Sequence, residues 1–177
     1  MDIAVDLDGV IANPYPILAD RVINQLGAVL PFDKWHDPVF ENLFPTLDRG
    51  WIGRQFSDPA FWESVDVFPE SLDWLEGHRI KNTVHIVTAR PKNTAKATKL
   101  WLRKKGVPYH HIHHVPREDK HEMLHIIRAK FMVEDDPRNA LKISQSGIKC
   151  YIMTMPYNLH HDIGKSIRID SLREIEE

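Results

Sequence analysis

The sequence is poor in cysteine and has no long apolar run, and each shortage excludes a class of protein. A single cysteine, Cys150, among 177 residues rules out an internal disulfide and a zinc site made of several cysteines. No apolar run approaches the roughly 20 residues of a membrane-spanning helix, and the first ten residues lack the basic start of a signal peptide. We therefore expect a cytoplasmic protein without a membrane partner.

An excess of charge of one sign is also missing. The 23 Lys and Arg residues nearly balance 25 Asp and Glu residues, which gives a formal net charge of −2. This balance argues against a broad basic surface for duplex nucleic acid, but it allows a small anionic ligand. With 42% hydrophobic residues the chain can bury the core of one compact domain. A homodimer is an open alternative to a monomer.

Five short apolar runs predict the strands of one sheet. They lie at about residues 2–6, 84–88, 111–115, 131–135 and 149–154, and such runs are typical of buried strands. Helical patterns follow at 93–105, 118–129 and 138–146, the last with Gly147 as its expected C-terminal cap. The alternation predicts an α/β fold, a Rossmann-like parallel sheet of about five strands with helices on both faces.

The segment 13–69 does not fit this alternation. It opens with an amphipathic helix pattern whose apolar face carries Ile17, Leu18, Val22, Ile23 and Leu26. Eight of the 16 aromatic residues follow between positions 32 and 62. We interpret the segment as a small helical cap inserted after the first strand, with most of its aromatics in its own core and one or two facing a ligand. The core domain then comprises residues 1–12 and 70–177.

Two carboxylates lie where the first strand ends. Asp6 and Asp8 are two residues apart, directly before Gly9, and side chains at such spacing on a strand point to the same side. Neighbouring anions need a cation between them or a bound proton. The pair therefore predicts a hard metal ion such as Mg²⁺ or a general acid, and a simple polar turn is the alternative.

A second strand end carries groups suited to an anion. Ligands of parallel sheets bind beyond the carboxyl ends of the strands, so the end of the second strand should lie beside Asp6 and Asp8. Thr88 offers a hydroxyl there, and Ala89 and Arg90 offer backbone amides before a helix. We expect phosphate to bind at this turn, although an ordinary strand-to-helix turn would have the same residues.

The fourth predicted strand ends in three consecutive acids, Glu134, Asp135 and Asp136. Neighbouring acids repel one another unless a cation is near, so these residues are predicted to include metal ligands. The alternative is that they interact with the positive end of the dipole of the following helix. Two lysines are candidates for a cation of the site. Lys130 precedes the strand and so lies at its far end, whereas Lys120 lies in the first turn of the preceding helix, where its charge opposes the helix dipole. We choose Lys120.

These motifs, in this order, resemble those of the haloacid dehalogenase-type phosphohydrolases. Asp-Leu-Asp-Gly-Val at 6–10 looks like the first motif of that family, Thr88 like the second, Lys120 like the third and Glu134-Asp135 like the fourth. An insert directly after the first motif corresponds to the small-cap subtype. Arg-Glu-Asp-Lys at 117–120 and Val-Glu-Asp-Asp-Pro at 133–137 are similar to the 5′(3′)-deoxyribonucleotidase-like branch.

The resemblance implies a Mg²⁺-dependent phosphatase. Asp6 would be the nucleophile that forms an aspartyl-phosphate, and Asp8 the general acid and base. The phosphate contacts would be Thr88, Ala89 and Lys120, with Arg90 as a further candidate. Mg²⁺ would bind Asp6, the backbone carbonyl of Asp8, and Asp135. Glu134 and Asp136 are the alternative ligands, because the branch often carries Asp-Asp at 134–135.

Two histidine-rich stretches suggest competing functions. Residues 121–125 satisfy the zinc-protease pattern H-E-x-x-H, but no third ligand follows them. The four histidines at 110, 111, 113 and 114 would alternate between the two faces of a strand. They therefore predict a solvated edge strand that is sensitive to mild acid rather than one metal site.

Three functions are compatible with these residues. The favoured one is a phosphatase of (deoxy)nucleoside monophosphates, in which a cap aromatic stacks on the base and Arg49 or Arg54 adds positive charge. The second is the same reaction on a sugar phosphate or another small metabolite. The third is a non-catalytic phosphate-binding regulatory domain, which the intact pair of Asp6 and Asp8 disfavours.

Overall fold

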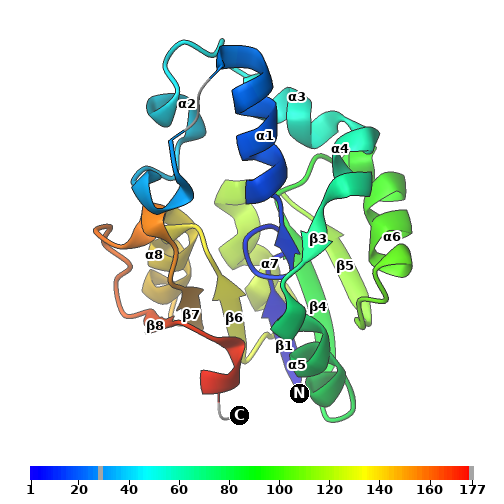
Figure 1. Ribbon diagram of the computed structural model, residues 1–177. Helices are drawn as coiled ribbons and strands as arrows, with labels where there is room; N and C mark the ends of the chain where they lie inside the picture. The colour runs from blue at the N-terminus through cyan, green and yellow to red at the C-terminus, as the bar shows by residue number, and fades with distance from the viewer. Residues whose placement is uncertain (28–29, 176–177) are drawn as a thin grey trace.

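The computed structural model describes residues 1–27 and 30–175, and it shows a parallel sheet with a cap over one end (Figure 1). Residues 28–29 of the predicted cap and 176–177 of the predicted core lie outside the described residues. Within the described part, six strands form the main sheet in the order β5-β4-β1-β6-β7-β8. Their bounds are Asp2–Val5 (β1), Thr83–Thr88 (β4), His111–His114 (β5), Phe131–Glu134 (β6), Lys149–Met153 (β7) and Ile167–Ile169 (β8). Every pairing is parallel, as predicted.

The sheet has one strand more than the sequence predicted. β8 pairs with β7, with Tyr151 opposite Ile167 and Met153 opposite Ile169. Only Ile169 of the three residues is buried. So short a strand has no usable hydrophobic period, and its ladder with β7 decides its conformation.

Helices cover both faces of the sheet because successive residues of each strand point to opposite sides. On one face lie α5 (Pro69–Arg79) and α6 (Ala95–Lys104), which pack against Ile3 and Val5 of β1. On the other face lie α7 (Lys120–Ile126) and α8 (Pro137–Gln145), which pack around Ala4. Gly147 adopts φ 86° just after Ser146, the C-cap of α8, as the sequence predicted.

Two helices begin later than predicted because each is preceded by a 3₁₀ turn, and α7 also ends at Ile126, before the predicted end at 129. The stretch predicted at 93–105 forms η2 (Lys92–Thr94) and α6, and the stretch at 118–129 forms η3 (Arg117–Asp119) and the shorter α7. Pro91 and Pro116 cap these turns in extended conformations, with ψ of 143° and 149°. The tight turns place Lys120 at the first residue of α7.

The cap follows β1 in the chain and lies above the carboxyl ends of the strands (Figure 1). Its helices are α1 (Tyr15–Leu26), η1 (Phe32–Lys34), α2 (Phe40–Leu43), α3 (Trp51–Ser57) and α4 (Pro59–Ser64). A short antiparallel pair that the sequence did not predict, β2 (Ala12–Asn13) and β3 (Asp66–Val67), forms the base of the cap. The chain enters and leaves the cap through these paired strands.

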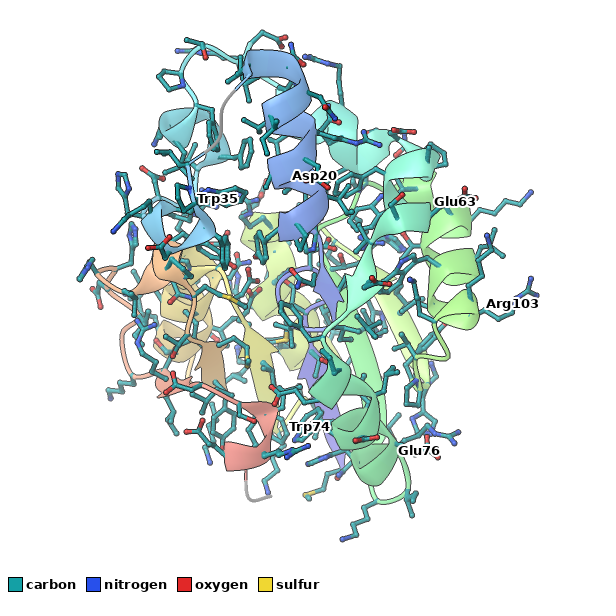
Figure 2. The ribbon with its side chains drawn as sticks, in the orientation of Figure 1. Asp20, Trp35, Glu63, Trp74, Glu76 and Arg103 are labelled. Atoms are coloured by element: carbon teal, nitrogen blue, oxygen red, sulfur yellow. The ribbon has the colours of Figure 1, made fainter. Side chains whose placement is uncertain are left out.

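Aromatic rings fill the interior of the cap, as the sequence predicted. Trp35, Trp51, Phe61 and Trp62 are all buried, and Trp35 lies between η1 and α1 in Figure 2. The predicted apolar face of α1 is only partly buried, since Ile23 remains 42% exposed. Leu26, in the last turn of α1, is 37% exposed as well. No helix in the described residues is long and apolar enough to cross a membrane.

Candidate active site

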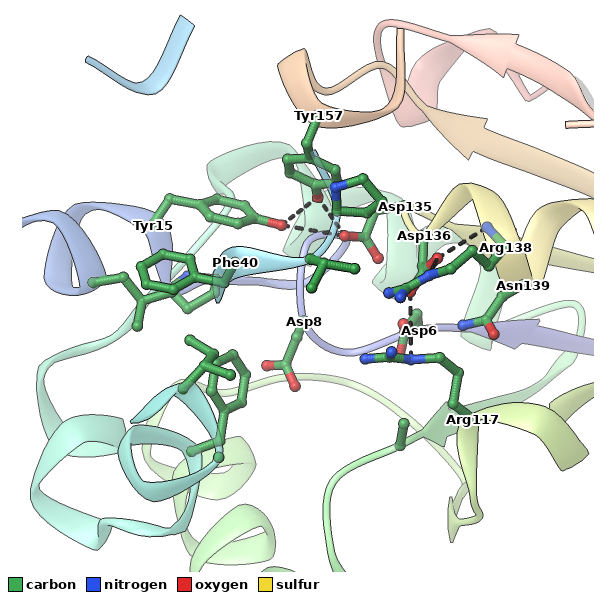
Figure 3. A pocket seen from close by; sticks show the side chains of 18 of the residues that line it. Asp6, Asp8, Tyr15, Phe40, Arg117, Asp135, Asp136, Arg138, Asn139 and Tyr157 are labelled. Carbon is green, nitrogen blue, oxygen red and sulfur yellow. Dashed lines mark hydrogen bonds and ion pairs between the residues drawn. The ribbon is translucent and has the colours of Figure 1, made fainter. Parts of the chain in front are cut away.

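A cavity of about 400 Å³ lies between the cap and the carboxyl ends of the strands (Figure 3). The cap contributes a largely apolar wall that includes Tyr15, Leu18, Trp35, Val39, Phe40, Ile52 and Phe56. The core contributes a polar floor that includes Asp6, Asp8, Ala89, Arg90, Lys120, Asp135, Asp136 and Tyr157. The cavity therefore joins one charged end to one aromatic end.

Asp6 lies directly after β1, where its backbone amide still donates to the carbonyl of Val133 at 2.8 Å. Its Oδ1 accepts the amide of Leu7 at 2.7 Å, and its Oδ2 lies 2.6 Å from Nζ of Lys120. Burial raises the pKa of Asp6 to about 8, with Lys120 opposing the shift and Glu134 adding to it. The charge of Lys120 alone therefore does not offset the cost of burying an ionised Asp6.

Glu134 holds Lys120 in place. Its Oε1 accepts Nζ of Lys120 at 2.7 Å and Nδ2 of Asn139 at 2.8 Å, while Oε2 accepts the amides of Asp135 and Asp136 at 2.9 and 3.0 Å. Burial works to lower the pKa of Lys120, but Asp6 and Glu134 raise it above its usual value. The ammonium stays charged and is aimed at Asp6.

Asp135 is held by two tyrosines from different parts of the fold. Tyr15 on α1 donates to its Oδ2 at 3.2 Å, and Tyr157 in η4 (Pro156–Asn158) donates to the same oxygen. The two hydroxyls also contact each other, as Figure 3 shows. Burial, followed by repulsion from Glu134 and Asp6, raises the pKa of Asp135 well above its usual range.

The acidic cluster fits a hard divalent cation. Oxygen atoms of Asp6, Glu134 and Asp135 all lie within 4.8 Å of one another, and Mg²⁺ prefers such carboxylate ligands. Three buried acids face one ammonium, so a further cation would relieve their repulsion. The oxygens of Glu134 already accept four hydrogen bonds. Asp6 and Asp135 are therefore better suited than Glu134 to hold the ion.

Gly9 makes this arrangement sterically feasible. Its φ is +85°, and a Cβ built on it would lie 2.1 Å from Oδ2 of Asp135 and 2.9 Å from the hydroxyl of Tyr15. A side chain at position 9 would thus displace the proposed metal ligand. The Gly of the Asp-Leu-Asp-Gly motif leaves room for Asp135, an acid directly after β6 and 126 residues further along the chain.

Asp8 points into the cavity from the loop after β1 (Figure 3). Arg90 binds both of its oxygens, with Nη2 2.6 Å from Oδ1 and Nε 2.9 Å from Oδ2. The side chain of Asp8 is only 21% exposed, and that of Arg90 is 1% exposed. The Asp8 carboxylate is thus directed by Arg90, and its predicted metal contact through the backbone carbonyl stays a prediction.

The remaining predicted residues lie at or below this floor. Thr88 is fully buried, and its Oγ1 accepts the amide of Arg90 at 3.2 Å. Ala89 lines the cavity, whereas Thr88 is not among the described residues that line it. Asp136 is paired with two guanidinium groups, 2.6 Å from Arg138 and 3.4 Å from Arg117. Burial opposes the shift, but the Arg138 hydrogen bond lowers the pKa of Asp136.

Sequence reasoning missed both tyrosines and three further polar residues that line the cavity, Arg117, Arg138 and Asn139. Tyr157 follows the last predicted strand in a stretch without periodicity, so nothing in the sequence marks it. The arginines suggested earlier lie elsewhere: Arg54 pairs with Asp48 at 2.6 Å on the surface, and neither it nor Arg49 is a described lining residue.

The histidine-rich stretches lie outside the cavity wall. His121 and His125 are on α7, and they belong to no group of three metal-ligating side chains in the described residues. β5 is an edge strand of the sheet, as predicted, with His111 exposed.

Comparisons with known proteins match the chain to a nucleotidase family. The family model described as "5' nucleotidase, deoxy (Pyrimidine), cytosolic type C protein" matches residues 1–177. A relative from Halalkalibacterium halodurans, named "Putative nucleotidase", is 23% identical over 96% of this chain and 88% of its own length. A "Nucleotidase" from Clostridium acetobutylicum is 30% identical over 44% of this chain and 40% of its own.

Solved structures share the fold. A haloacid dehalogenase-like family hydrolase from Streptococcus pneumoniae superposes with a TM-score of 0.68 at 18% identity, covering 98% of this chain and 95% of that one. CbbY from Rhodobacter sphaeroides, solved in complex with phosphate, superposes with a TM-score of 0.61 at 16% identity, covering 99% of this chain and 96% of that one.

Proposed function

The chain belongs to the family of 5′ nucleotidase, deoxy (pyrimidine), cytosolic type C proteins, and on that premise we propose that it is a Mg²⁺-dependent phosphatase of (deoxy)nucleoside monophosphates. Its fold is that of a haloacid dehalogenase-like hydrolase. One observation carries the proposal. The buried carboxylate of Asp6 faces the cavity 2.6 Å from the Lys120 ammonium, within 4.8 Å of the oxygen of a second acid, Asp135. Such a constellation suits attack on an anionic phosphoryl group.

In the proposed reaction Asp6 attacks phosphorus, and the bond from phosphorus to the leaving oxygen breaks to give an aspartyl-phosphate. Asp8 gives a proton to the leaving oxygen and later takes one from the water that releases phosphate. When bound by Asp6 and Asp135, Mg²⁺ supplies positive charge that screens the repulsion between nucleophile and phosphate. The charge of Lys120 and the amide of Ala89 face the phosphate oxygens. Thr88 supports that turn by accepting the amide of Arg90.

The aromatic wall supports a nucleotide as substrate. Phe40 lines the cavity and stacks on Trp51 with ring centroids 5.4 Å apart and planes at 6°, so its ring is already oriented. Stacking of a base on an aromatic ring is worth about 1–3 kcal/mol in single-strand binders. A cavity of about 400 Å³ is also within the usual range for small-ligand sites.

Substitution of the nucleophile tests the reaction. Asp6→Asn should lower kcat by about 10³-fold or more, because the amide cannot form the aspartyl-phosphate, while the circular dichroism spectrum stays that of the wild type. Asp20→Asn, the same change at an exposed residue of α1 (Figure 2), should leave kcat unaltered. Substantial phosphatase activity in Asp6→Asn would refute the assignment.

A substrate screen tests the specificity. Hydrolysis of deoxynucleoside 5′- and 3′-monophosphates should exceed that of sugar phosphates in kcat/KM, and both should cease when EDTA removes divalent metal. A preference for sugar phosphates would overturn the substrate class but keep the chemistry. Phosphate binding without turnover of any ester would favour the regulatory alternative.

A further inference from the structure

Arg90 carries a buried guanidinium whose anionic partner is Asp8. The residue is 3% exposed, and both Nε and Nη2 donate to the Asp8 carboxylate, at 2.9 and 2.6 Å. Nη1 donates to the hydroxyl of Thr98 on α6 at 3.4 Å. Such a fork-to-carboxylate pair fixes two bond directions at once, which a single contact cannot do.

Aromatic rings close the space around this guanidinium. The Arg90 Cζ lies 3.2 Å from the ring centroid of Trp62 on the cap helix α4, and 5.6 Å from that of Trp101 on α6. Trp62 is 2% exposed, and its indole nitrogen donates to the carbonyl of Phe56 at 2.9 Å. Phe56 lines the cavity. The stack therefore connects the wall of the cap to the side chain that binds Asp8.

The backbone of Arg90 is fixed as well. Its amide donates to Oγ1 of Thr88 at 3.2 Å, and its carbonyl lies 3.1 Å from Nδ1 of His114 on β5. Two contacts on the main chain and a ring stack on the side chain leave the guanidinium little freedom. The orientation of the Asp8 carboxylate follows from that of Arg90.

We propose that Arg90 is a positioning residue that directs the Asp8 carboxylate toward the leaving oxygen, and that the Trp62 stack fixes Arg90 for this task. The inference rests on the proposed function, in which Asp8 transfers the proton. In the first step the bond between Asp6 and phosphorus forms and the bond to the leaving oxygen breaks. A proton that Asp8 has taken from solvent, or from the water of the preceding turnover, moves to that oxygen. Misplacing Asp8 harms this step only when the leaving oxygen needs the proton.

Leaving groups of different basicity test the role of Arg90. An alkyl ester such as a deoxynucleoside 5′-monophosphate needs a proton as it leaves, whereas p-nitrophenolate leaves readily without one. Because kcat/KM reports the steps up to the aspartyl-phosphate, Arg90→Gln should lower it about 10²-fold for the nucleotide and less than about threefold for p-nitrophenyl phosphate. Asp8→Asn should show the same selectivity, and Arg90→Lys, which keeps charge but not the fork, should lie between wild type and Arg90→Gln.

Substitutions of Trp62 test the role of its stack on Arg90 and leave both residues of the Arg90–Asp8 ion pair in place. Trp62→Leu should reproduce the leaving-group selectivity in weaker form, about tenfold for the nucleotide, and Trp62→Phe, which restores an aromatic face, should recover most of the loss. Trp74→Leu is the matched control, because Trp74 is a buried tryptophan of α5 on the sheet away from the cap (Figure 2). It should lower stability without changing the ratio of the two kcat/KM values.

Inhibition by orthophosphate separates positioning from direct substrate binding. If Arg90 positions Asp8, the inhibition constant of orthophosphate should change less than about threefold in Arg90→Gln. A large rise in that constant, together with equal losses for both esters, would mean that Arg90 binds the phosphate itself, and the inference would be overturned. An inactive wild type or an active Asp6→Asn would instead refute the proposed function. If kcat/KM falls selectively for the nucleotide in Asp8→Asn but in none of the Arg90 variants, only the role of Arg90 is refuted.

Discussion

At the scale of single residues, the site depends on how closely acids can approach one another. The glycine at position 9 has φ +85°, and Oδ2 of Asp135 occupies the space where a side chain would begin. Tyr15 and Tyr157 both donate to that oxygen. The geometry of the proposed metal ligand is therefore fixed by one missing Cβ and two hydroxyls.

Gly9→Ala should damage both the fold and the metal site. The left-handed backbone alone costs about 1–2 kcal/mol for a residue with a Cβ, and the clash at 2.1 Å forces Asp135 to move. Urea unfolding should show the loss of stability, and calorimetry should show weaker Mg²⁺ binding. Gly147→Ala is the matched control, with φ +86° and open space around the added Cβ. It should lose stability through the backbone alone and bind Mg²⁺ normally, and equal Mg²⁺ affinity in both variants would contradict the role given to Gly9.

At the scale of elements, β5 is the edge strand on which the histidines gather. His85 of the neighbouring β4 links His113 to Asp2, with 3.0 Å from its Nδ1 to Nε2 of His113 and 3.0 Å from its Nε2 to Oδ1 of Asp2. Burial, followed by the neighbouring His85 and His111, lowers the pKa of His113. The attachment of β5 to the sheet thus favours neutral imidazole.

His113 should make the protein less stable in mild acid. Because the folded-state pKa is lowered, the unfolded chain binds the proton first as the pH falls. The contribution of His113 to the free energy of unfolding is therefore complete above about pH 6.5 and is lost as the pH falls through the folded-state pKa. Urea midpoints at pH 7.5 and 5.5 should therefore differ more in the wild type than in His113→Gln. The comparison with the variant is needed because Asp6 titrates in the same window with the opposite sign. His125→Gln, at an exposed site on α7, should behave as the wild type.

At the scale of the whole molecule, the junction of cap and core concentrates buried negative charge. Tyr15 of the cap contacts Asp135 of the core, and Trp62 of the cap contacts Arg90 of the core. Acidic groups that the fold buries destabilise it when they ionise. A bound cation would therefore stabilise the cap and the core together.

Mg²⁺ should stabilise the protein increasingly as the pH rises. The folded-state pKa of Asp6 is raised from 3.8 to about 8, so its contribution to stability is complete below about pH 4 and is lost as the pH rises through 8. Mg²⁺ binds the ionised acids and offsets that loss, by about 2.7 kcal/mol at a hundredfold excess over its Kd. Melting temperatures with Mg²⁺ and with EDTA should diverge between pH 5 and 8. Asp6→Asn should reduce the divergence, and a Mg²⁺ effect independent of pH would contradict the linkage.

The sequence by itself determined the class of fold and the main charged groups of the cavity floor. Alternating apolar runs and helical patterns indicated the parallel sheet because both periods are local properties of the chain. Asp6, Asp8 and Lys120 could be placed at one edge because the carboxyl ends of parallel strands coincide. The direction of the strand ruled out Lys130, and the place of Lys120 in the first turn of the preceding helix favoured it; the structure brings Lys120 to 2.6 Å from Asp6.

Only the tertiary structure decided which partners these residues have. The bonds from Tyr157 to Asp135, from Arg90 to Asp8 and from Glu134 to Lys120 join side chains whose separation in sequence bears no relation to any helical or strand period. The three-residue strand β8 and the paired strands under the cap likewise owe their conformation to their neighbours. Local patterns record which face of an element is buried, whereas direction and distance between side chains arise only when the elements pack.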